Sequence, residues 1–286
     1  MKTWIAGARP RTLPAAIAPV LIGTALIQVD GVAIKWFNAA LALGVGLSVQ
    51  VAVNFSNDYS DGIRGSDEAR VGPTRLVASG LQSPKAVKLA AIIFYALASV
   101  FGLILALATS PVLILVGALA IFAGWRYTGG ANPYGYRGFG EMSVFIFFGL
   151  VATMGSYFAQ SERLSWQALL LSIPMGSLAC AILGLNNLRD RPKDELVGKQ
   201  TLAVRLGDTR ARALIISLLS LAFLSSIGAV VITPWALISL ITLPLHISLV
   251  RAITSGALGA DLIPLLGKTG GLQLLTSLLI TLALSL

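Results

Sequence analysis

Long apolar runs separated by short polar segments repeat along the whole chain. Each run is about 16 to 25 residues long, which suits an α-helix that crosses a hydrocarbon core of roughly 30 Å. The pattern predicts nine transmembrane helices near 13–29, 37–57, 85–108, 111–128, 139–160, 166–187, 211–232, 235–252 and 269–285. We therefore expect an all-α integral membrane protein in which residues 1–286 form a single domain.

Composition supports this fold class. The sequence is 56% hydrophobic and only 12% charged, which is about half the charged fraction of a typical soluble domain. The deficit argues against a soluble globular protein and favours one membrane bundle. The single cysteine, Cys180, excludes an internal disulfide bond.

The distribution of basic residues predicts an orientation. With the N-terminus inside and the helices alternating, all of the 21 Lys and Arg residues except Lys35 and Arg163 fall on the inner side. Basic loops stay in the cytoplasm, so we expect an N-inside, C-outside multi-pass protein of the cell (inner) membrane with its polar loops on the cytoplasmic side. This bias and an anionic substrate explain the net charge of +9; the expected partner is the lipid bilayer, with no nucleic acid.

Polar side chains gather at the ends of two predicted spans. In the stretch 54–67, Asn54, Asn57, Asp58 and Asp61 are spaced i, i+3, i+4 and i+7, which places them on one face of a helix. After the sixth span, Asn187, Asp190 and Asp194 follow the spacing i, i+3 and i+7. Each set therefore forms a helical face rich in oxygen ligands.

The two polar segments also resemble each other. Each begins with Asn at a span end, continues with Asp at helical spacing, and then runs through Asp-Glu, Val-Gly, a basic residue and Leu. They follow the second and the sixth spans. We interpret them as a degenerate internal repeat of four helices each, with a ninth helix added.

The acidic faces predict a metal site. Converging carboxylates repel and raise one another's pKa, so they need cations, and oxygen ligands without His or Cys favour Mg²⁺ or Ca²⁺. Arg75, Lys199 and Arg205 are interleaved as phosphate partners. The expected carboxylate ligands are Asp58, Asp61, Asp67, Asp190 and Asp194. The alternative is that these are solvated charges at helix ends, as either aspartate alone would be.

A diphosphate held by Mg²⁺ beside apolar helices suggests a polyprenyl diphosphate as substrate. Its head requires the metal, and its tail requires walls like lipid. The metal would neutralise the leaving group as the allylic C–O bond ionises, and the carbocation would have to be kept from water.

Four stretches of the sequence resemble the UbiA superfamily of aromatic prenyltransferases. They are ARPRTLPAAIAPVLIGTA (8–25), NDYSDGIRGSDEARVGPTRLVASG (57–80), YTGGANPYGYRGFGEMSVFIFFG (127–149) and NNLRDRPKDELVGKQTLAVRLG (186–207). Members have nine transmembrane helices, with Asp-rich motifs on the second and sixth. Within the superfamily, the sequence is most similar to the branch that prenylates 1,4-dihydroxy-2-naphthoate in menaquinone biosynthesis.

The first Asp motif departs from the wider superfamily pattern N-D-x-x-D-x-x-x-D. Asn57, Asp58 and Asp61 match it, whereas Gly65 stands at its last position and Asp67 follows two residues later. This G-x-D ending is like the naphthoate branch, and it makes Asp67 a less certain metal ligand than Asp61. The second motif matches without departure.

The resemblance implies a Mg²⁺-dependent enzyme that transfers a polyprenyl group to 1,4-dihydroxy-2-naphthoate with loss of CO₂, giving a demethylmenaquinone precursor. The implied catalytic residues are Asp58, Asp61, Asp190 and Asp194. The implied metal ligands are Asn57, Asp58, Asp61, Asp67, Asp190 and Asp194. The implied diphosphate contacts are Arg75, Lys199, Asn57 and Asn187, with Arg11 as a further candidate.

The acceptor site is expected in the segment between the fourth and fifth spans. Tyr127, Tyr136, Arg137 and Glu141 are its candidates, since a cation would suit the acceptor carboxylate and Glu141 could assist phenol deprotonation. Simpler roles remain open: tyrosines anchor helices at the membrane interface, and an acidic residue is favourable in the first turn of a helix. Arg11 could equally be a positive-inside anchor.

Two other functions compete with this one. A secondary transporter is also built from repeats with buried acids, but its site would lie at the bilayer midplane rather than at span ends. A prenyltransferase for another aromatic acceptor, such as 4-hydroxybenzoate, homogentisate or haem, is the second alternative.

His246, the only histidine, lies within a span, where we expect a packing role.

Overall fold

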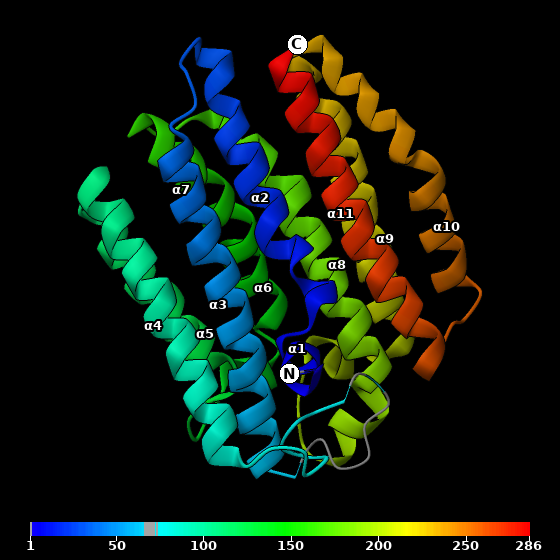
Figure 1. The fold of residues 1–286 in the computed structure, drawn as a ribbon. Helices are drawn as coiled ribbons and strands as arrows, with labels where there is room; N and C mark the ends of the chain where they lie inside the picture. Colours follow the sequence, from blue (N-terminus) through cyan, green and yellow to red (C-terminus); the bar gives the residue numbers. More distant parts are fainter. Residues whose placement is uncertain (1, 66–71, 73) are drawn as a thin grey trace.

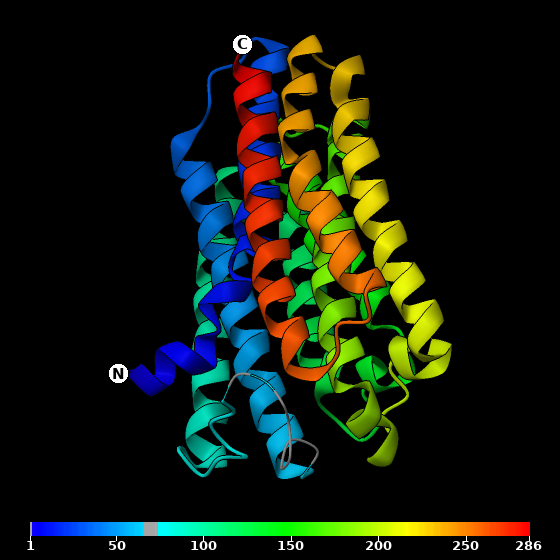
Figure 2. The same ribbon diagram turned by 90° about the vertical axis from the view of Figure 1, so that its right-hand side faces the viewer.

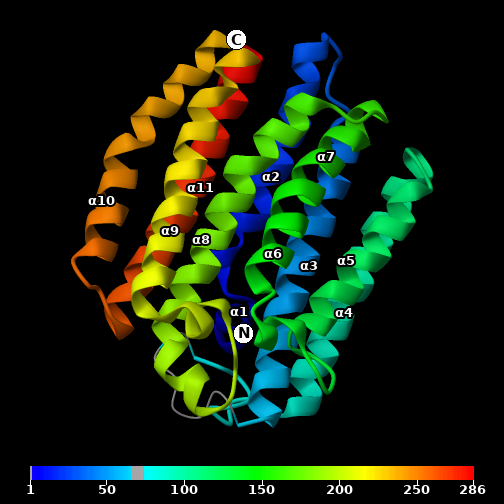
Figure 3. The same cartoon turned by 180° about the vertical axis from the view of Figure 1, so that it is seen from behind.

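The computed structural model describes residues 2–65, 72 and 74–286, and over these residues the regular structure is entirely helical. The helices stand roughly side by side in one bundle, with α4 and α10 at opposite edges (Figures 1 and 3). The α-helices are α1 (Lys2–Ala8), α2 (Pro14–Ala25), α3 (Trp36–Ile63), α4 (Pro84–Ala108), α5 (Val112–Thr128), α6 (Gly140–Val144), α7 (Ala152–Ser161), α8 (Trp166–Leu196), α9 (Leu202–Gly228), α10 (Leu243–Thr254) and α11 (Leu262–Ser285).

The described residues contain fewer membrane-length helices than the nine that the sequence predicts. Seven helical segments are long and apolar enough to cross a bilayer, and the count reaches eight if the pair Thr3–Thr12 and Pro14–Asp30, bent by 49°, is one span. The predicted span 111–128 is α5, which is apolar but has only 17 residues. At about 1.5 Å per residue it falls short of the roughly 30 Å core, so the prediction of nine full spans is wrong.

The two helices that carry the acidic faces are longer than predicted. The apolar pattern ends near 57 and 187, whereas α3 continues to Ile63 and α8 to Leu196. An apolar run marks the part of a helix that lies in hydrocarbon and says nothing about where the backbone hydrogen bonds end. Asp58 and Asp61 therefore lie near the end of α3, and Asp190 and Asp194 near the end of α8.

Helix α8 forms the centre of the bundle. Leu171, Met175, Leu178 and Leu185 of this helix are fully buried in the main apolar core. Its most extensive contacts are with α9, just as those of α3 are with α4. The matching pairs fit the predicted internal repeat, which stays a prediction.

A seven-residue π-helical segment, Phe145–Val151, joins α6 to α7 and packs directly on α8. The contact is made by backbone, because Gly149 and Gly176 face each other. A Cβ on Gly149 would lie 2.7 Å from the Cα of Gly176. Only glycine permits this spacing, so the two residues set the distance between the two helices.

The helical path is interrupted between α1 and α2, and side-chain hydrogen bonds stabilise this bend. Arg9 adopts a left-handed conformation with φ of 53°. Asn54 of α3 donates to the carbonyl of Ala8 (2.9 Å) and to Oγ1 of Thr12 (3.0 Å). As a result α1 leaves the bundle sideways (Figure 2), at the end opposite the C-terminus.

Candidate active site

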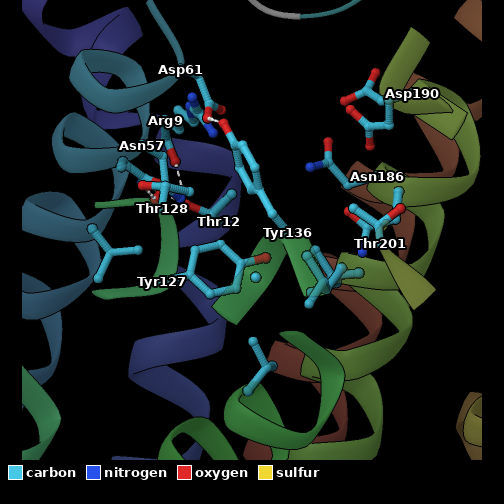
Figure 4. A pocket seen from close by; sticks show the side chains of 18 of the residues that line it. Arg9, Thr12, Asn57, Asp61, Tyr127, Thr128, Tyr136, Asn186, Asp190 and Thr201 are labelled. Carbon is cyan, nitrogen blue, oxygen red and sulfur yellow. Dashed lines mark hydrogen bonds between the residues drawn. The ribbon is translucent and has the colours of Figure 1, made fainter. Parts of the chain in front are cut away.

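A polar pocket lies between α3 and α8 at the end of the bundle where α1 leaves it. Figure 4 shows Asn57 and Asp61 of α3 on one wall and Asn186 and Asp190 of α8 on the other, with Tyr136 between them. The acids lie in the last turns of their helices. The sequence predicts the acids at the ends of helices for an enzyme, whereas a transporter site would lie near the bilayer midplane.

Asp61 has charged and polar partners on both of its carboxylate oxygens. Its Oδ1 lies 3.3 Å from Nζ of Lys199, and its Oδ2 lies 3.4 Å from Nη2 of Arg75. The hydroxyl of Tyr136 also donates to Oδ1. Because Asp61 is only 4% exposed, these positive and polar partners are what stabilise its charge in a low-dielectric site.

Lys199 also contacts the α8 wall of the pocket. Lys199 Nζ lies 4.0 Å from Oδ1 of Asp194, and the Lys199 backbone N–H donates to the Asp194 carbonyl (2.8 Å). Asp190 accepts two hydrogen bonds of 2.7 Å from the side chain of Arg189. Lys199 thus joins the α3 and α8 motifs that the sequence places about 130 residues apart.

The segment between α5 and α6 closes one side of the pocket. The ring of Tyr136 has Lys199 Nζ at 4.5 Å and Arg64 Cζ at 5.3 Å from its centroid, which is cation–π geometry. Its carbonyl accepts from Gln200 N (2.9 Å). Nearby, burial raises the pKa of Tyr134, and its hydrogen bond with Ser143 acts in the opposite direction.

Glu141, in the first turn of α6, is buried against α8. Its Oε1 accepts a 2.9 Å hydrogen bond from Nδ2 of Asn187, a residue of the pocket wall. Over the described residues, its Oε2 is buried without a hydrogen-bond partner. Glu141 itself lies outside the lining of the polar pocket and contacts it through Asn187.

A second, apolar pocket adjoins the polar one. Val53, Tyr127, Val144 and Phe148 line both pockets and form the boundary between them. Beyond it, the walls come from α2, α3, α4, α5 and α7 and are mostly Val, Leu, Ala and Gly. The arrangement suits a ligand with a charged head and a long apolar tail.

The structure brings most of the predicted site residues together. Asn57, Asp61, Arg75, Tyr127, Tyr136, Asn187, Asp190, Asp194 and Lys199 line the polar pocket. Arg11 and Arg137 are exposed and lie outside its lining, so neither is placed to hold a substrate carboxylate or phosphate there. Asp58 is fully buried and also outside the lining. Asp67 lies outside the described residues.

The sequence does not predict several of the residues that line the pocket. Arg9, Thr12, Asn186, Thr128 and Thr201 all contribute to the lining. The left-handed turn at Arg9 is what directs this arginine, rather than Arg11, to the pocket, and no periodicity signals such a break. Thr128 hydrogen-bonds Oδ1 of Asn57 (2.8 Å), a contact that only the tertiary fold creates.

The carboxylates are spread over the walls rather than gathered in one cage. Within the described parts of the chain, no three His, Cys, Asp or Glu side chains form a group that could hold a metal ion. The predicted convergence of the carboxylates is therefore not confirmed. Mg²⁺ usually takes one or two protein carboxylates and completes its shell with water and phosphate. The oxygen-rich walls around Asp61 and Asp190 fit that mode of binding.

The fold and pocket define a multi-pass membrane protein with an acidic, cation-bearing site open to an apolar chamber. The chain belongs to the UbiA prenyltransferase family, whose sequence profile matches residues 16–259. It is 47% identical to the 1,4-dihydroxy-2-naphthoate octaprenyltransferase of Mycobacterium tuberculosis, over 99% of this chain and 96% of that one. The octaprenyltransferase of the same name from Escherichia coli is 35% identical, over 100% and 96% of the two chains.

A solved structure shares the fold. The UbiA homologue from Archaeoglobus fulgidus bound to GPP and Mg²⁺ superposes with a TM-score of 0.72 over 99% of both chains, at 15% sequence identity. The bundle predicted from the sequence resemblance is thus confirmed as a UbiA-like helical fold.

Proposed function

We propose that this protein transfers a polyprenyl group from an allylic polyprenyl diphosphate to 1,4-dihydroxy-2-naphthoate, with loss of CO₂, in menaquinone biosynthesis. The observation that carries the proposal is that the two pockets adjoin and share four lining residues, because a ligand that extends through both places its charged head among the Asp motifs and its tail among apolar helices. The naphthoate acceptor follows from the printed names of the relatives.

The polar walls would hold the diphosphate and its metal. Asp61, Asp190 and Asp194, with Asn57 and Asn187, would supply oxygen ligands for Mg²⁺. When bound, Mg²⁺ neutralises charge on the departing diphosphate. Arg75 and Lys199 lie within 3.4 Å of Asp61 oxygens, where they are close enough to bind phosphate oxygens as well.

The chamber behind the polar pocket would hold the chain and exclude water. Phe148 and Tyr127 stand at the boundary of the two pockets, where the allylic carbon of such a ligand would lie. An apolar enclosure at this point would protect an allylic cation from attack by water.

The acceptor would react on the side of Tyr127 and Glu141. The allylic C–O bond breaks and its electron pair leaves with the diphosphate. The ring carbon that bears the carboxylate forms the new C–C bond, and the bond to the carboxylate breaks, returns its electrons to the ring and releases CO₂. Glu141, which lies outside the pocket lining, would fix Asn187, which is part of it. The naphthoate keeps its hydroxyl proton, because loss of CO₂ restores the ring.

The assay uses membranes that contain the protein, Mg²⁺, an allylic polyprenyl diphosphate and 1,4-dihydroxy-2-naphthoate. We expect CO₂ release together with a lipid-soluble naphthoquinol. Parallel reactions with 4-hydroxybenzoate and homogentisate distinguish the acceptor. Turnover of one of these but not of the naphthoate would replace the acceptor, and no prenylation of any acceptor would reject the enzyme.

A further inference from the structure

The first aspartate of the first motif, Asp58, has surroundings unlike those of Asn57 and Asp61. Asp58 is 0% exposed, and its carboxylate accepts from the backbone N–H groups of Leu76 (2.8 Å) and Val77 (3.0 Å). Asn57 and Asp61 line the polar pocket, whereas Asp58 does not. Successive residues of a helix point about 100° apart, so Asp58 can face the 74–80 segment while its two neighbours face the pocket.

The two N–H groups belong to a single helical turn. Ser79 N donates to the carbonyl of Arg75 (3.1 Å), and Gly80 N donates to that of Val77 (3.0 Å). The first N–H groups of such a turn have no partner inside it, and a carboxylate is a favourable acceptor for them. Asp58 therefore caps the turn that begins at Arg75.

Close packing fixes the same turn on α3 and α1. Leu76 is 0% exposed and lies against Gly7, where an added Cβ would come within 2.7 Å of its Cδ1. An added Cβ on Gly62 would lie 2.5 Å from Val77. With the turn held in place, the Arg75 side chain, 7% exposed, extends to Asp61 in the pocket.

We propose that Asp58 is a positioning residue that fixes the Arg75 turn, and that it is not a ligand of the metal. In this assignment Asn57 and Asp61 face the metal and the diphosphate, while Asp58 acts through Arg75. The assignment rests on the proposed function for its substrate, although the hydrogen bonds that carry it do not depend on which acceptor is used.

The first test measures amide hydrogen exchange in the purified full-length protein. In Asp58→Asn, exchange at Leu76 and Val77 should be about tenfold faster or more, because a charge-assisted pair of hydrogen bonds is weakened. Asp61→Asn should leave exchange at these amides unchanged. Asp261→Asn, at an exposed carboxylate outside the site, is the matched control. Unchanged exchange in Asp58→Asn would overturn the proposal.

The second test separates metal binding from substrate binding. Mg²⁺ titration with inorganic pyrophosphate held at a concentration that saturates each variant should give the wild-type half-saturation in Asp58→Asn and a half-saturation raised at least about tenfold in Asp61→Asn. The KM for polyprenyl diphosphate should rise in Asp58→Asn. If the two variants shift Mg²⁺ half-saturation equally, Asp58 is a ligand and the proposal fails.

A double-variant comparison tests the route through Arg75. Asp58→Asn should raise KM in the wild type but add little to Arg75→Gln, since both act on the same contact. Independent, additive effects would overturn the proposal. Loss of naphthoate prenylation in the wild-type assay would reject the proposed function instead, because hydrogen exchange and Mg²⁺·pyrophosphate binding are measured without an acceptor.

Discussion

At the scale of single residues, Asp61 contacts two positively charged side chains and one hydroxyl of the site. Arg75, Lys199 and Tyr136 all reach its two oxygens. Removing one partner of a buried charged cluster leaves the others unpaired, which is more costly than losing the attraction itself. Asp61 is thus important both for the stability of the pocket and for its chemistry.

Replacing Asp61 by Asn should therefore lower both turnover and stability. We expect kcat to fall by at least about 100-fold, the scale of losing one electrostatic contact to a transition state, and the thermal midpoint in detergent to fall as well. Asp190→Asn should lower kcat similarly. Product formation and differential scanning fluorimetry measure the two effects, with Asp261→Asn as control. Wild-type rates in either pocket variant would remove the Asp motifs from the mechanism.

Tyr136 and Lys199 share Oδ1 of Asp61, so a metal ion that binds this oxygen must displace at least one of them. Tyr136→Phe keeps the ring beneath Lys199 but removes the competing hydroxyl. We expect the half-saturating Mg²⁺ concentration to fall by about three- to tenfold, in line with one net hydrogen bond. Calorimetric titration with Mg²⁺ and pyrophosphate measures it. A higher requirement for Mg²⁺ would mean that the hydroxyl assists binding.

How far the sequence predicts the site depends on the residue. Spacing places Asp61, Asp190 and Asp194 on helix faces, and the structure lines the pocket with all three. The same spacing does not distinguish the role of Asp58 from that of Asp61. Asp58 accepts hydrogen bonds from the backbone of a turn 18 residues away, and helix spacing does not indicate that turn. The choice between Arg9 and Arg11 likewise depends on a backbone break that no hydropathy pattern encodes.

At the scale of elements, the π-helical segment and α8 depend on backbone contact at Gly149 and Gly176. Side chains cannot enter this contact, so small changes there have large effects. The segment also carries Phe147 and Phe148, which line the apolar pocket. The helix spacing therefore sets the wall of the chamber.

Gly149→Ala should separate the segment from α8 and destabilise the protein by about 1–3 kcal/mol, as overpacking of a close contact does. Gly271→Ala is the matched control, because over the described residues nothing lies within 4 Å of a Cβ added there. Thermal unfolding in one detergent compares the two. Equal midpoints would show that the contact can relax without cost.

At the scale of the whole molecule, the hydropathy pattern predicts where the long apolar helices lie, but it does not predict their bends or exact lengths. It predicted only the second helix of the bent N-terminal pair, as the span 13–29, and it counted the 17 residues of α5 as a full crossing. Hydropathy measures apolar length, whereas a bend such as that at Arg9 depends on side-chain hydrogen bonds from α3. The bundle was therefore predictable, and its irregular helices were not.

The orientation in the membrane remains a prediction, and the sequence offers a convenient test because Cys180 is its only cysteine and is buried. Arg163 and Lys85 are exposed near helix ends. In intact cells, Arg163→Cys should react with a membrane-impermeant maleimide, and Lys85→Cys should react only after permeabilisation. The wild-type protein is the blank. The reverse pattern would place the acidic pocket outside.

The boundary formed by Val53, Tyr127, Val144 and Phe148 also determines how products leave. In the proposed reaction, the allylic C–O bond that breaks lies at this boundary. The diphosphate is therefore left in the polar pocket and the prenyl chain in the apolar pocket. Diphosphate can then dissolve in water while the prenylated ring partitions into lipid, and neither has to cross the other's solvent. The protein would work as a phase-transfer catalyst, joining a water-borne aromatic acid to a membrane-borne chain without extracting the chain from the bilayer.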